Sequence, residues 1–99
     1  MTTKREIVKS VAEKTALTQV QTHEVVQLTL EAIVEAILTE GRMELRNFGV
    51  FEVRHRKARK ARDPRTGETM DVPARNVVAF RASQALEEQV AALPPADGS

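Results

Sequence analysis

The side chains with the greatest capacity for chemistry are the arginines and lysines of residues 54–81, which we call the basic segment. Nine basic residues stand there against Asp63, Glu68 and Asp71, so the segment carries a net charge of +6. The whole chain carries +1, and all other residues together therefore carry −5. Such a concentrated block of guanidinium and ammonium groups indicates a binding site for a polyanion. Its basic residues are Arg54, Arg56, Lys57, Arg59, Lys60, Arg62, Arg65, Arg75 and Arg81.

Other reactive side chains are too scattered to predict a catalytic or metal site. The chain has no cysteine, which excludes disulfides and thiolate chemistry. No acidic cluster joins His23 and His55 into a set of metal ligands. We interpret His23 as a surface residue, whereas His55 suits a phosphate contact and a solvated position equally. Ser10 and Ser83 lack a neighbouring histidine and acid. We predict no enzyme activity, no metal, no cofactor and no small-molecule substrate.

The cations need an element that projects them, and residues 54–62 follow directly on an apolar strand pattern at residues 50–53. Because residues 54–62 contain no large apolar side chain, we predict a strand of a ribbon that projects from the core. Asp63 can accept a bond from the backbone ahead, Pro64 presets φ, and Gly67 can take φ > 0, which predicts a turn. About ten residues at ~3.3 Å each would reach roughly 30 Å. We expect the ribbon to be mobile until it meets its ligand.

The return strand is predicted from Glu68 to about Phe80, with a bend at Pro73, which has no N–H to donate. Alternation would place cations on both faces of the ribbon, which suits an element flanked by phosphates on both sides, as in a DNA groove. A solvated basic loop or tail is the alternative, but tails rarely combine a turn signal with a second strand pattern. One face would carry Arg54, Arg56, Lys60 and Arg62, and the other His55, Lys57 and Arg59.

Two helices are predicted before the ribbon. Residues 3–6 have the pattern of a capping box, with the Thr3 hydroxyl on a free amide and Glu6 reaching back, and a helix follows to about Lys14. Thr18 repeats the capping signal, and the second helix runs from about Gln19 to Thr39, before Gly41. From Leu30 to Leu38 this helix is apolar on more than one stripe, so it needs more than one neighbour. The first helix is one neighbour, and a second subunit is the predicted other.

A small sheet and a third helix complete the predicted α+β fold. Alternation predicts a strand from Arg42 to Arg46, and residues 47–49 form a tight connection in which Gly49 is free to take φ > 0. Ser83 suits the N-cap of a helix that runs to about Ala92. The three phenylalanines do not interleave with the arginines as a single-strand stacking surface would require. We interpret them as core residues that flank the sheet: Phe48, Phe51 and Phe80.

Length and composition predict one globular domain over residues 1–93, with the arm at about residues 54–76 and a flexible tail at 94–99. Hydrophobic residues make up 41% of the 99 residues and charged residues 29%. The N-terminus meets Glu6 before any apolar run typical of a signal peptide, and no run approaches a membrane span. We therefore predict a cytoplasmic protein with no membrane partner.

The residues of the arm resemble the signature of the bacterial HU and integration host factor family of nucleoid proteins. The resemblance covers roughly residues 3–91, and its glycine, phenylalanine, arginine and proline positions keep the family's spacing. Three departures are Asp63 for the usual Asn, Asn47 for a common Gly, and an acidic third helix with Gln84, Glu87 and Glu88 near the family's lysines. The matching residues are Phe48-Gly49-Val50-Phe51-Glu52-Val53-Arg54, then Arg56, Arg59 and Arg62, then Pro64-Arg65-Thr66-Gly67-Glu68, and on the return strand Pro73-Ala74 and Val78-Ala79-Phe80.

This resemblance implies an intertwined dimer with a helical base, a three-stranded antiparallel sheet and two arms that wrap duplex DNA in the minor groove. It implies that Pro64 wedges between base pairs, and that Phe48, Phe51 and Phe80 lie in the dimer core. The dimer would be a homodimer or a heterodimer with a related chain, associated with the nucleoid. The predicted DNA-binding set is Arg54, Arg56, Lys57, Arg59, Lys60, Arg62, Pro64, Arg65, Arg75 and Arg81.

Two other functions fit a basic hairpin. One is an RNA-binding module, which replacement of duplex DNA by RNA would discriminate. The other is an interaction protein whose arm binds an acidic partner, and such binding would survive nuclease treatment. The prediction is an architectural protein that bends or compacts double-stranded DNA with little sequence specificity.

Overall fold

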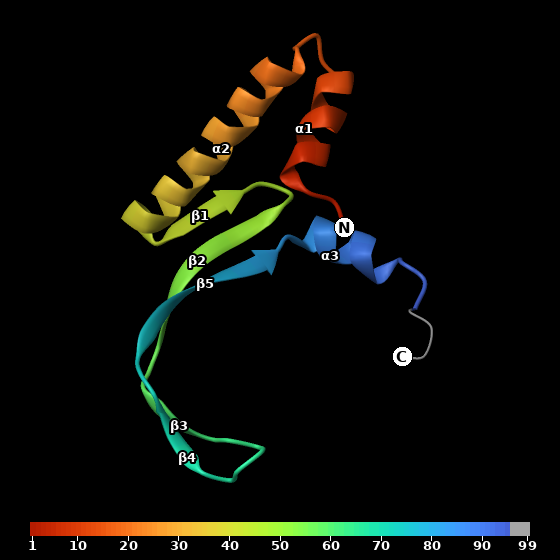
Figure 1. The fold of residues 1–99 in the computed structure, drawn as a ribbon. Coiled ribbons are helices and arrows are strands. Elements are labelled where there is room, and N and C mark those ends of the chain that lie inside the picture. The colour runs from red at the N-terminus through yellow and green to blue at the C-terminus, as the bar shows by residue number, and fades with distance from the viewer. Residues whose placement is uncertain (96–99) are drawn as a thin grey trace. The chain divides into compact units, whose positions relative to one another are not determined.

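The computed structural model describes residues 1–95 and divides into two compact units, residues 1–39 and the residues from Glu40 onward. Helices combine with antiparallel strands, as the predicted α+β class requires. The elements, in chain order, are α1 (Lys4–Glu13), α2 (Gln19–Glu40), β1 (Arg42–Leu45), β2 (Gly49–Arg56), β3 (Arg59–Arg62), β4 (Thr69–Val72), β5 (Arg75–Ala82) and α3 (Gln84–Ala91) (Figure 1).

The two N-terminal helices begin differently. Thr3 is extended at the start of α1, but its side chain makes no capping hydrogen bond, so the predicted capping box is wrong there. Thr3 is exposed, and water can satisfy the free amides of the first turn. At the start of α2 the predicted box is present: the Thr18 hydroxyl accepts from the Gln21 amide at 3.1 Å, and Gln21 Oε1 accepts from the Thr18 amide at 3.0 Å.

Inside the first unit, the buried side chains are small, one on α1 and one on α2. Val8 and Thr22 are buried, and the Thr22 hydroxyl donates to the Thr18 carbonyl at 2.8 Å, so burial leaves it satisfied. The helix α2 ends one residue later than predicted, at Glu40, and Gly41 stops it with a φ of 73°.

The second unit is built on a three-stranded antiparallel sheet in the order β1-β2-β5. Directly opposite residues of neighbouring strands share a face, and successive residues alternate between faces. One face, which we call the aromatic face, carries Met43 beside Phe51 and Phe80, and Val53 beside Val78. The other, which we call the charged face, carries Arg42, Glu44, Glu52, Arg54, Arg56, Arg75 and Arg81.

The connection from β1 to β2 corrects one prediction. Positive φ occurs at Asn47, at 64°, and not at Gly49. Gly49 is required for another reason: a Cβ there would lie 2.5 Å from the Phe80 ring and 2.6 Å from the Arg81 carbonyl oxygen. The missing side chain therefore lets β5 and its phenylalanine approach the start of β2. The strand β1 also ends one residue early, at Leu45.

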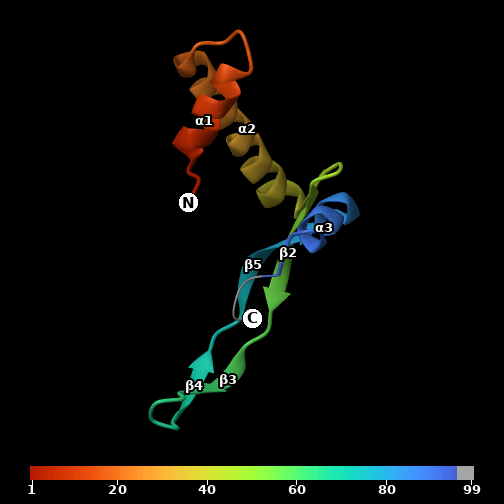
Figure 2. The ribbon, with the colours of Figure 1, turned by 90° about the vertical axis from the view of Figure 1, so that its right-hand side faces the viewer.

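The arm is two ladders rather than one continuous ribbon. The β2–β5 ladder ends at the pair Arg56 and Arg75, and a separate two-stranded sheet of β3 and β4 begins with Arg59 opposite Val72 (Figures 1 and 2). The interruption predicted at Pro73 is present, because proline has no N–H for the ladder. The outgoing strand is interrupted as well, between the end of β2 at Arg56 and the start of β3 at Arg59. Side chains therefore alternate between faces only within each ladder, and Lys57 belongs to neither ladder.

The helix α3 begins as predicted, with the Ser83 hydroxyl accepting from the Leu86 amide at 3.1 Å. It ends at Ala91, one residue earlier than predicted. Of the predicted tail, residues 96–99 lie outside the described residues. Among residues 1–95, no helix combines the length and the apolar character needed to cross a membrane.

Candidate nucleic-acid interface

The charged face gathers arginines that are far apart in the sequence. The register places Arg56 opposite Arg75, and Arg81 opposite Val50, all exposed or half-buried on the same side of the sheet. It also brings in Arg42, which lies opposite Glu52 on β1 and is exposed. Sequence analysis missed Arg42, because alternation in residues 42–46 shows only that it is on a polar face. Only the register of β1 against β2 shows that Arg42 lies beside Glu52.

Glu52 is the second residue that sequence analysis missed as part of this surface. Its carboxylate accepts a hydrogen bond from Arg54 at 3.2 Å and forms an ion pair with Arg42 at 3.7 Å. The hydrogen bond from Arg54, helped by the positive charges of Arg54, Arg81 and Arg42, holds the pKa of this carboxyl below its ordinary value against the opposing effect of desolvation. Glu52 is therefore ionised at neutral pH.

The β3–β4 ladder, which we call the distal ladder, presents its cations to solvent. Arg59, Lys60 and Arg62 of β3 are exposed, and β4 places Asp71 opposite Lys60. Within residues 1–95, the ion pairs are confined to Glu52 with Arg42 and Arg54. The cations of the distal ladder therefore make no ion pair in the described part of the chain.

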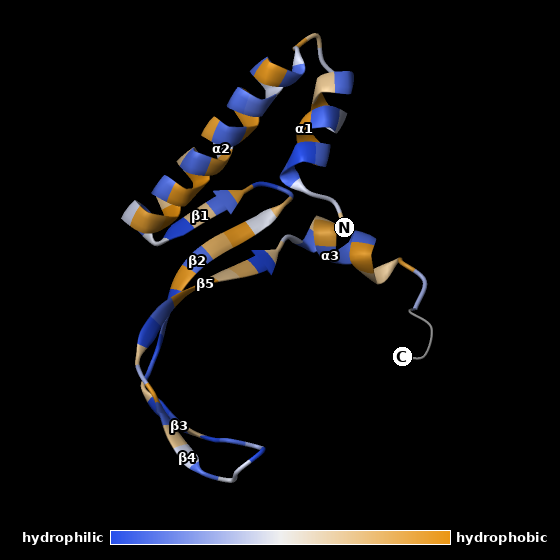
Figure 3. Cartoon of the chain, in the orientation of Figure 1, coloured by the Kyte–Doolittle hydropathy of each residue, from blue (hydrophilic) through white to orange (hydrophobic). Residues whose placement is uncertain are grey.

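The turn at the tip has the predicted construction. Asp63 Oδ1 accepts from the Arg65 amide at 2.8 Å, and the Asp63 carbonyl accepts from the Gly67 amide at 2.7 Å. Gly67 has a φ of 76°, the left-handed conformation expected of it. Pro64 is exposed at this turn. Figure 3 shows that the tip is mostly hydrophilic, whereas β2 and β5 carry hydrophobic stretches where they lie in the three-stranded sheet.

His55 lies on the other side of the ribbon from Arg54 and Arg56. It is opposite Asn76 in the register, and its Nδ1 is 3.2 Å from Asn76 Oδ1. The aromatic face continues from there into the phenylalanines. The Phe80 ring lies 4.8 Å from the Phe51 ring and 5.5 Å from the Phe48 ring, centroid to centroid, both in tilted arrangements.

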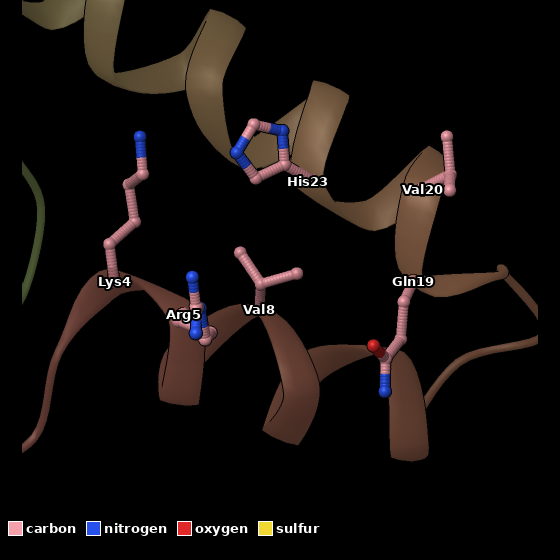
Figure 4. A pocket seen from close by; sticks show the side chains of 6 residues that line it. All are labelled: Lys4, Arg5, Val8, Gln19, Val20 and His23. Atoms are coloured by element: carbon pink, nitrogen blue, oxygen red, sulfur yellow. The ribbon is translucent and has the colours of Figure 1, made fainter.

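A second basic feature lies within the first unit, in an open groove between α1 and α2 (Figure 4). Lys4, Arg5 and Val8 stand on its α1 side and His23 on its α2 side. Lys4 Nζ donates to Gln27 Oε1. His23 is exposed, as predicted. No group of three or more histidine, aspartate or glutamate side chains suited to a metal ion occurs in the described residues.

The helix α3 is the acidic part of the second unit. Glu87 and Glu88 are exposed, and Glu88 accepts a hydrogen bond from Gln84 at 3.2 Å. Together the sheet, the arm and this helix define a class of protein: a small α+β fold that presents a basic face and a basic two-stranded arm. Such a surface matches the phosphates of a nucleic acid.

Comparison with known proteins narrows this class to one family. Residues 2–91 match the family described as "Bacterial DNA-binding protein". The chain is 45% identical over 92 residues to the DNA-binding protein HU of Nostoc sp., covering 93% of this chain and 96% of that protein. It is 40% identical over 87 residues to HU of Geobacillus stearothermophilus, covering 88% and 97%.

The fold comparison agrees. An Anabaena HU–DNA cocrystal structure superposes with a TM-score of 0.81 at 42% identity, covering 93% of this chain and 100% of that chain. The chain belongs to the bacterial DNA-binding protein family, the family of HU. The resemblance inferred from the arm motif is thereby confirmed.

Proposed function

We propose that this chain is an architectural protein that binds duplex DNA through its basic arms and bends or compacts it with little sequence preference. The observation that carries the proposal is the register of the sheet. It aligns Arg54, Arg56 and Arg75 on one face of the β2–β5 ladder, and the separate β3–β4 ladder that follows along the chain adds further exposed cations. The HU relative solved with DNA supports the choice of ligand.

The proposed mode of binding is in the minor groove. A two-stranded ribbon with cations on both sides suits a groove whose walls are phosphate backbones. The minor groove offers a degenerate pattern of donors and acceptors, so contacts there give little sequence specificity. HU is itself a standard example of minor-groove architectural binding, so this mechanism comes from the family. The proposed contacts are Arg54, Arg56, Lys57, Arg59, Lys60, Arg62, Arg65, Arg75 and Arg81.

Pro64 is the proposed wedge. Its ring is exposed at the turn that joins β3 to β4, where no apolar core is available to it. Inserting a ring between base pairs costs a few kcal/mol of unstacking, which the contacts permitted by the bend offset. DNA that is already nicked or bent should therefore bind more tightly than an intact linear duplex.

The proposed functional state is a dimer, either of two identical chains or with a related chain. In the isolated chain, Leu30, Val34 and Leu38 of α2 are 43%, 52% and 77% exposed. Phe48 and Phe80 are also about half exposed, at 48% and 45%. A chain of this size cannot leave so much apolar surface in water without a partner. We place Phe48, Phe51 and Phe80 in the core of that dimer.

The remaining proposals follow from the same mechanism. Residues 1–93 act as one DNA-binding domain, with no enzymatic step and no cofactor. The protein resides in the cytoplasm and associates with the nucleoid. Sedimentation tests the dimer: we expect a dimer at micromolar concentration, and a melting temperature that rises with protein concentration. A well-folded monomer with concentration-independent melting would contradict it.

The test of the function is a gel-shift series that compares linear, nicked and pre-bent duplexes at two salt concentrations. We expect tighter binding to nicked and pre-bent DNA and a salt slope of magnitude at least ~4, from about 0.9 per neutralised phosphate. An RNA duplex of the same sequence serves as the competitor. Equal or stronger binding to that RNA would overturn the proposal in favour of an RNA-binding module.

A further inference from the structure

Glu52 is an acidic residue in the middle of a basic surface. It lies on the charged face, opposite Arg42 of β1 and two residues before Arg54 on its own strand. Its side chain is 21% exposed, whereas those of Arg42 and Arg54 are 55% and 47% exposed. The carboxylate is thus recessed between two guanidinium groups that reach further into solvent.

This arrangement occupies donors that a phosphate would otherwise use. Arg54 donates to Glu52 at 3.2 Å, and the Arg42 guanidinium is 3.7 Å from the second carboxylate oxygen. A phosphate that approaches Arg54 meets a negative charge already in place and must share or displace that hydrogen bond. The cations of the distal ladder face no such competition within residues 1–95, because none of them forms an ion pair there.

We propose that Glu52 limits DNA binding by acting as an internal counter-ion for the arginines of the sheet. The inference rests on the proposed function and refines it. The β3–β4 ladder supplies cations that are ready for phosphate, whereas Arg42 and Arg54 are partly neutralised by the single negative charge of Glu52. Glu52 therefore sets where along the charged face the phosphate contacts begin, and it keeps the affinity below what the arginine content allows.

The variant that tests this is Glu52→Gln, which keeps the size and hydrogen-bonding capacity of the side chain and removes its charge. The matched control is Glu44→Gln. Glu44 is exposed on the same face and belongs to β1, and it forms no ion pair within the described residues. Both variants change the net charge by the same amount. Their difference therefore measures the release of the arginines from Glu52.

The measurement is gel-shift affinity for one nicked duplex across a series from 50 to 200 mM salt. We expect Glu52→Gln to bind about two- to tenfold more tightly than the wild type at the lowest salt. Its slope should steepen by about 0.9 for each phosphate newly contacted, so the gain shrinks about fourfold per unit of slope across this range. Glu44→Gln should gain clearly less in affinity and should leave the slope nearly unchanged.

A second background separates ion pairing from net charge. In an Arg54→Ala chain, adding Glu52→Gln should give a smaller gain than in the wild-type background, because only Arg42 is left for it to release. Equal gains for the two variants in the wild-type background, or weaker binding by Glu52→Gln, would overturn the proposal.

The same gel-shift measurements test the proposed DNA-binding function separately from the role of Glu52. A wild type that fails to bind any duplex overturns the DNA-binding function itself, whereas a wild type that binds while Glu52→Gln gains nothing overturns the role of Glu52 alone. Melting curves of both variants establish that they are folded.

Discussion

The β1-β2-β5 sheet and the β3–β4 ladder of the second unit place their side chains in different surroundings. In the β1-β2-β5 sheet Phe80 packs closely against Gly49, and Arg42 and Arg54 share the carboxylate of Glu52. In the β3–β4 ladder most side chains are exposed, and the turn is held by its own backbone and by Asp63. The sheet is therefore built for stability and precise register, and the distal arm for contact with a ligand.

The largest effect is expected from Gly49→Ala in the sheet, for which Gly67→Ala in the arm is the matched comparison. Gly49→Ala would place its Cβ 2.5 Å from the Phe80 ring and 2.6 Å from a backbone oxygen. We expect it to lower the free energy of unfolding by about 2–4 kcal/mol, through displaced strands and an off-rotamer ring. Thermal melting at fixed protein concentration measures the loss.

Gly67→Ala is the matched change in the arm. Nothing lies within 4 Å of its would-be Cβ, and the cost is limited to a φ of 76° for alanine, about 1–2 kcal/mol confined to the turn. We expect little change in global melting. If Gly67→Ala destabilised the protein as much as Gly49→Ala, the arm would be part of the cooperative core and the division between the ladders would be wrong.

The next effect concerns the source of the binding energy. Replacing Arg59 and Arg62 by alanine removes two exposed cations from each arm. We expect the salt slope to fall by about 0.9 for each lost phosphate contact, so by up to about 4 for a dimer, with a matching loss of affinity at low salt. A titration of binding against salt measures both quantities.

The control for that prediction removes the same charge elsewhere. Lys9 and Lys14 are exposed in the first unit, and changing both to alanine deletes two positive charges per chain. We expect a smaller change in slope than for the arginine pair. Equal changes would mean that the affinity follows net charge rather than arm contacts.

What could be predicted from the sequence is the local chemistry. The tip turn, the cap at Thr18 and the cap at Ser83 each depend on residues within a few positions of one another, and each was predicted correctly. The role of Gly49 could not be predicted, because it depends on Phe80 of a strand far along the chain. The Thr3 cap was predicted by the same local rule as the Thr18 cap and is wrong, so a favourable residue pattern permits a cap without requiring it. Water can satisfy the amides of an exposed first turn instead.

The candidate site likewise combines residues that the sequence indicates with residues that only the folded structure brings together. The basic residues of the arm are evident from composition, and the family motif adds Pro64 to them. Arg54 lies two residues from Glu52 on the same strand, but the pairing of Arg42 with Glu52 required the register of β1 against β2. Hydrophobic alternation in a four-residue strand restricts that register only weakly, so long-range ion pairs are the part of the site that sequence reasoning misses.

A smaller effect separates bending from binding. Pro64→Ala removes the exposed ring at the tip, and we expect a smaller bend angle and a weaker preference for nicked DNA, with the salt slope nearly unchanged. Energy transfer between labels at the two ends of a duplex measures the bend. The control is Pro73→Ala, the same change at the break between the ladders, which should leave the bend close to that of the wild type. Equal bending by Pro64→Ala and the wild type would reduce Pro64 to a turn residue.

The smallest effect is expected at Asp63, which places a carboxylate beside the proposed wedge. One of its oxygens accepts from the Arg65 amide at 2.8 Å, and an asparagine side-chain oxygen accepts the same bond, so Asp63→Asn should keep the turn. The charge is lost, and with it the repulsion of nearby phosphates. We expect tighter binding by up to about 1 kcal/mol, larger at low salt because surface charges are screened.

Asp71→Asn is the control for Asp63→Asn, since it removes a carboxylate that lies within the β3–β4 ladder, opposite Lys60, rather than at the tip. A gel-shift titration at low and high salt compares the two variants. A larger gain for Asp63→Asn places the phosphates close to the tip, as a wedge requires. Equal gains would mean that the tip lies no nearer to the DNA than the flank of the arm. A loss of affinity would mean that the carboxylate holds the turn in a way that the amide cannot.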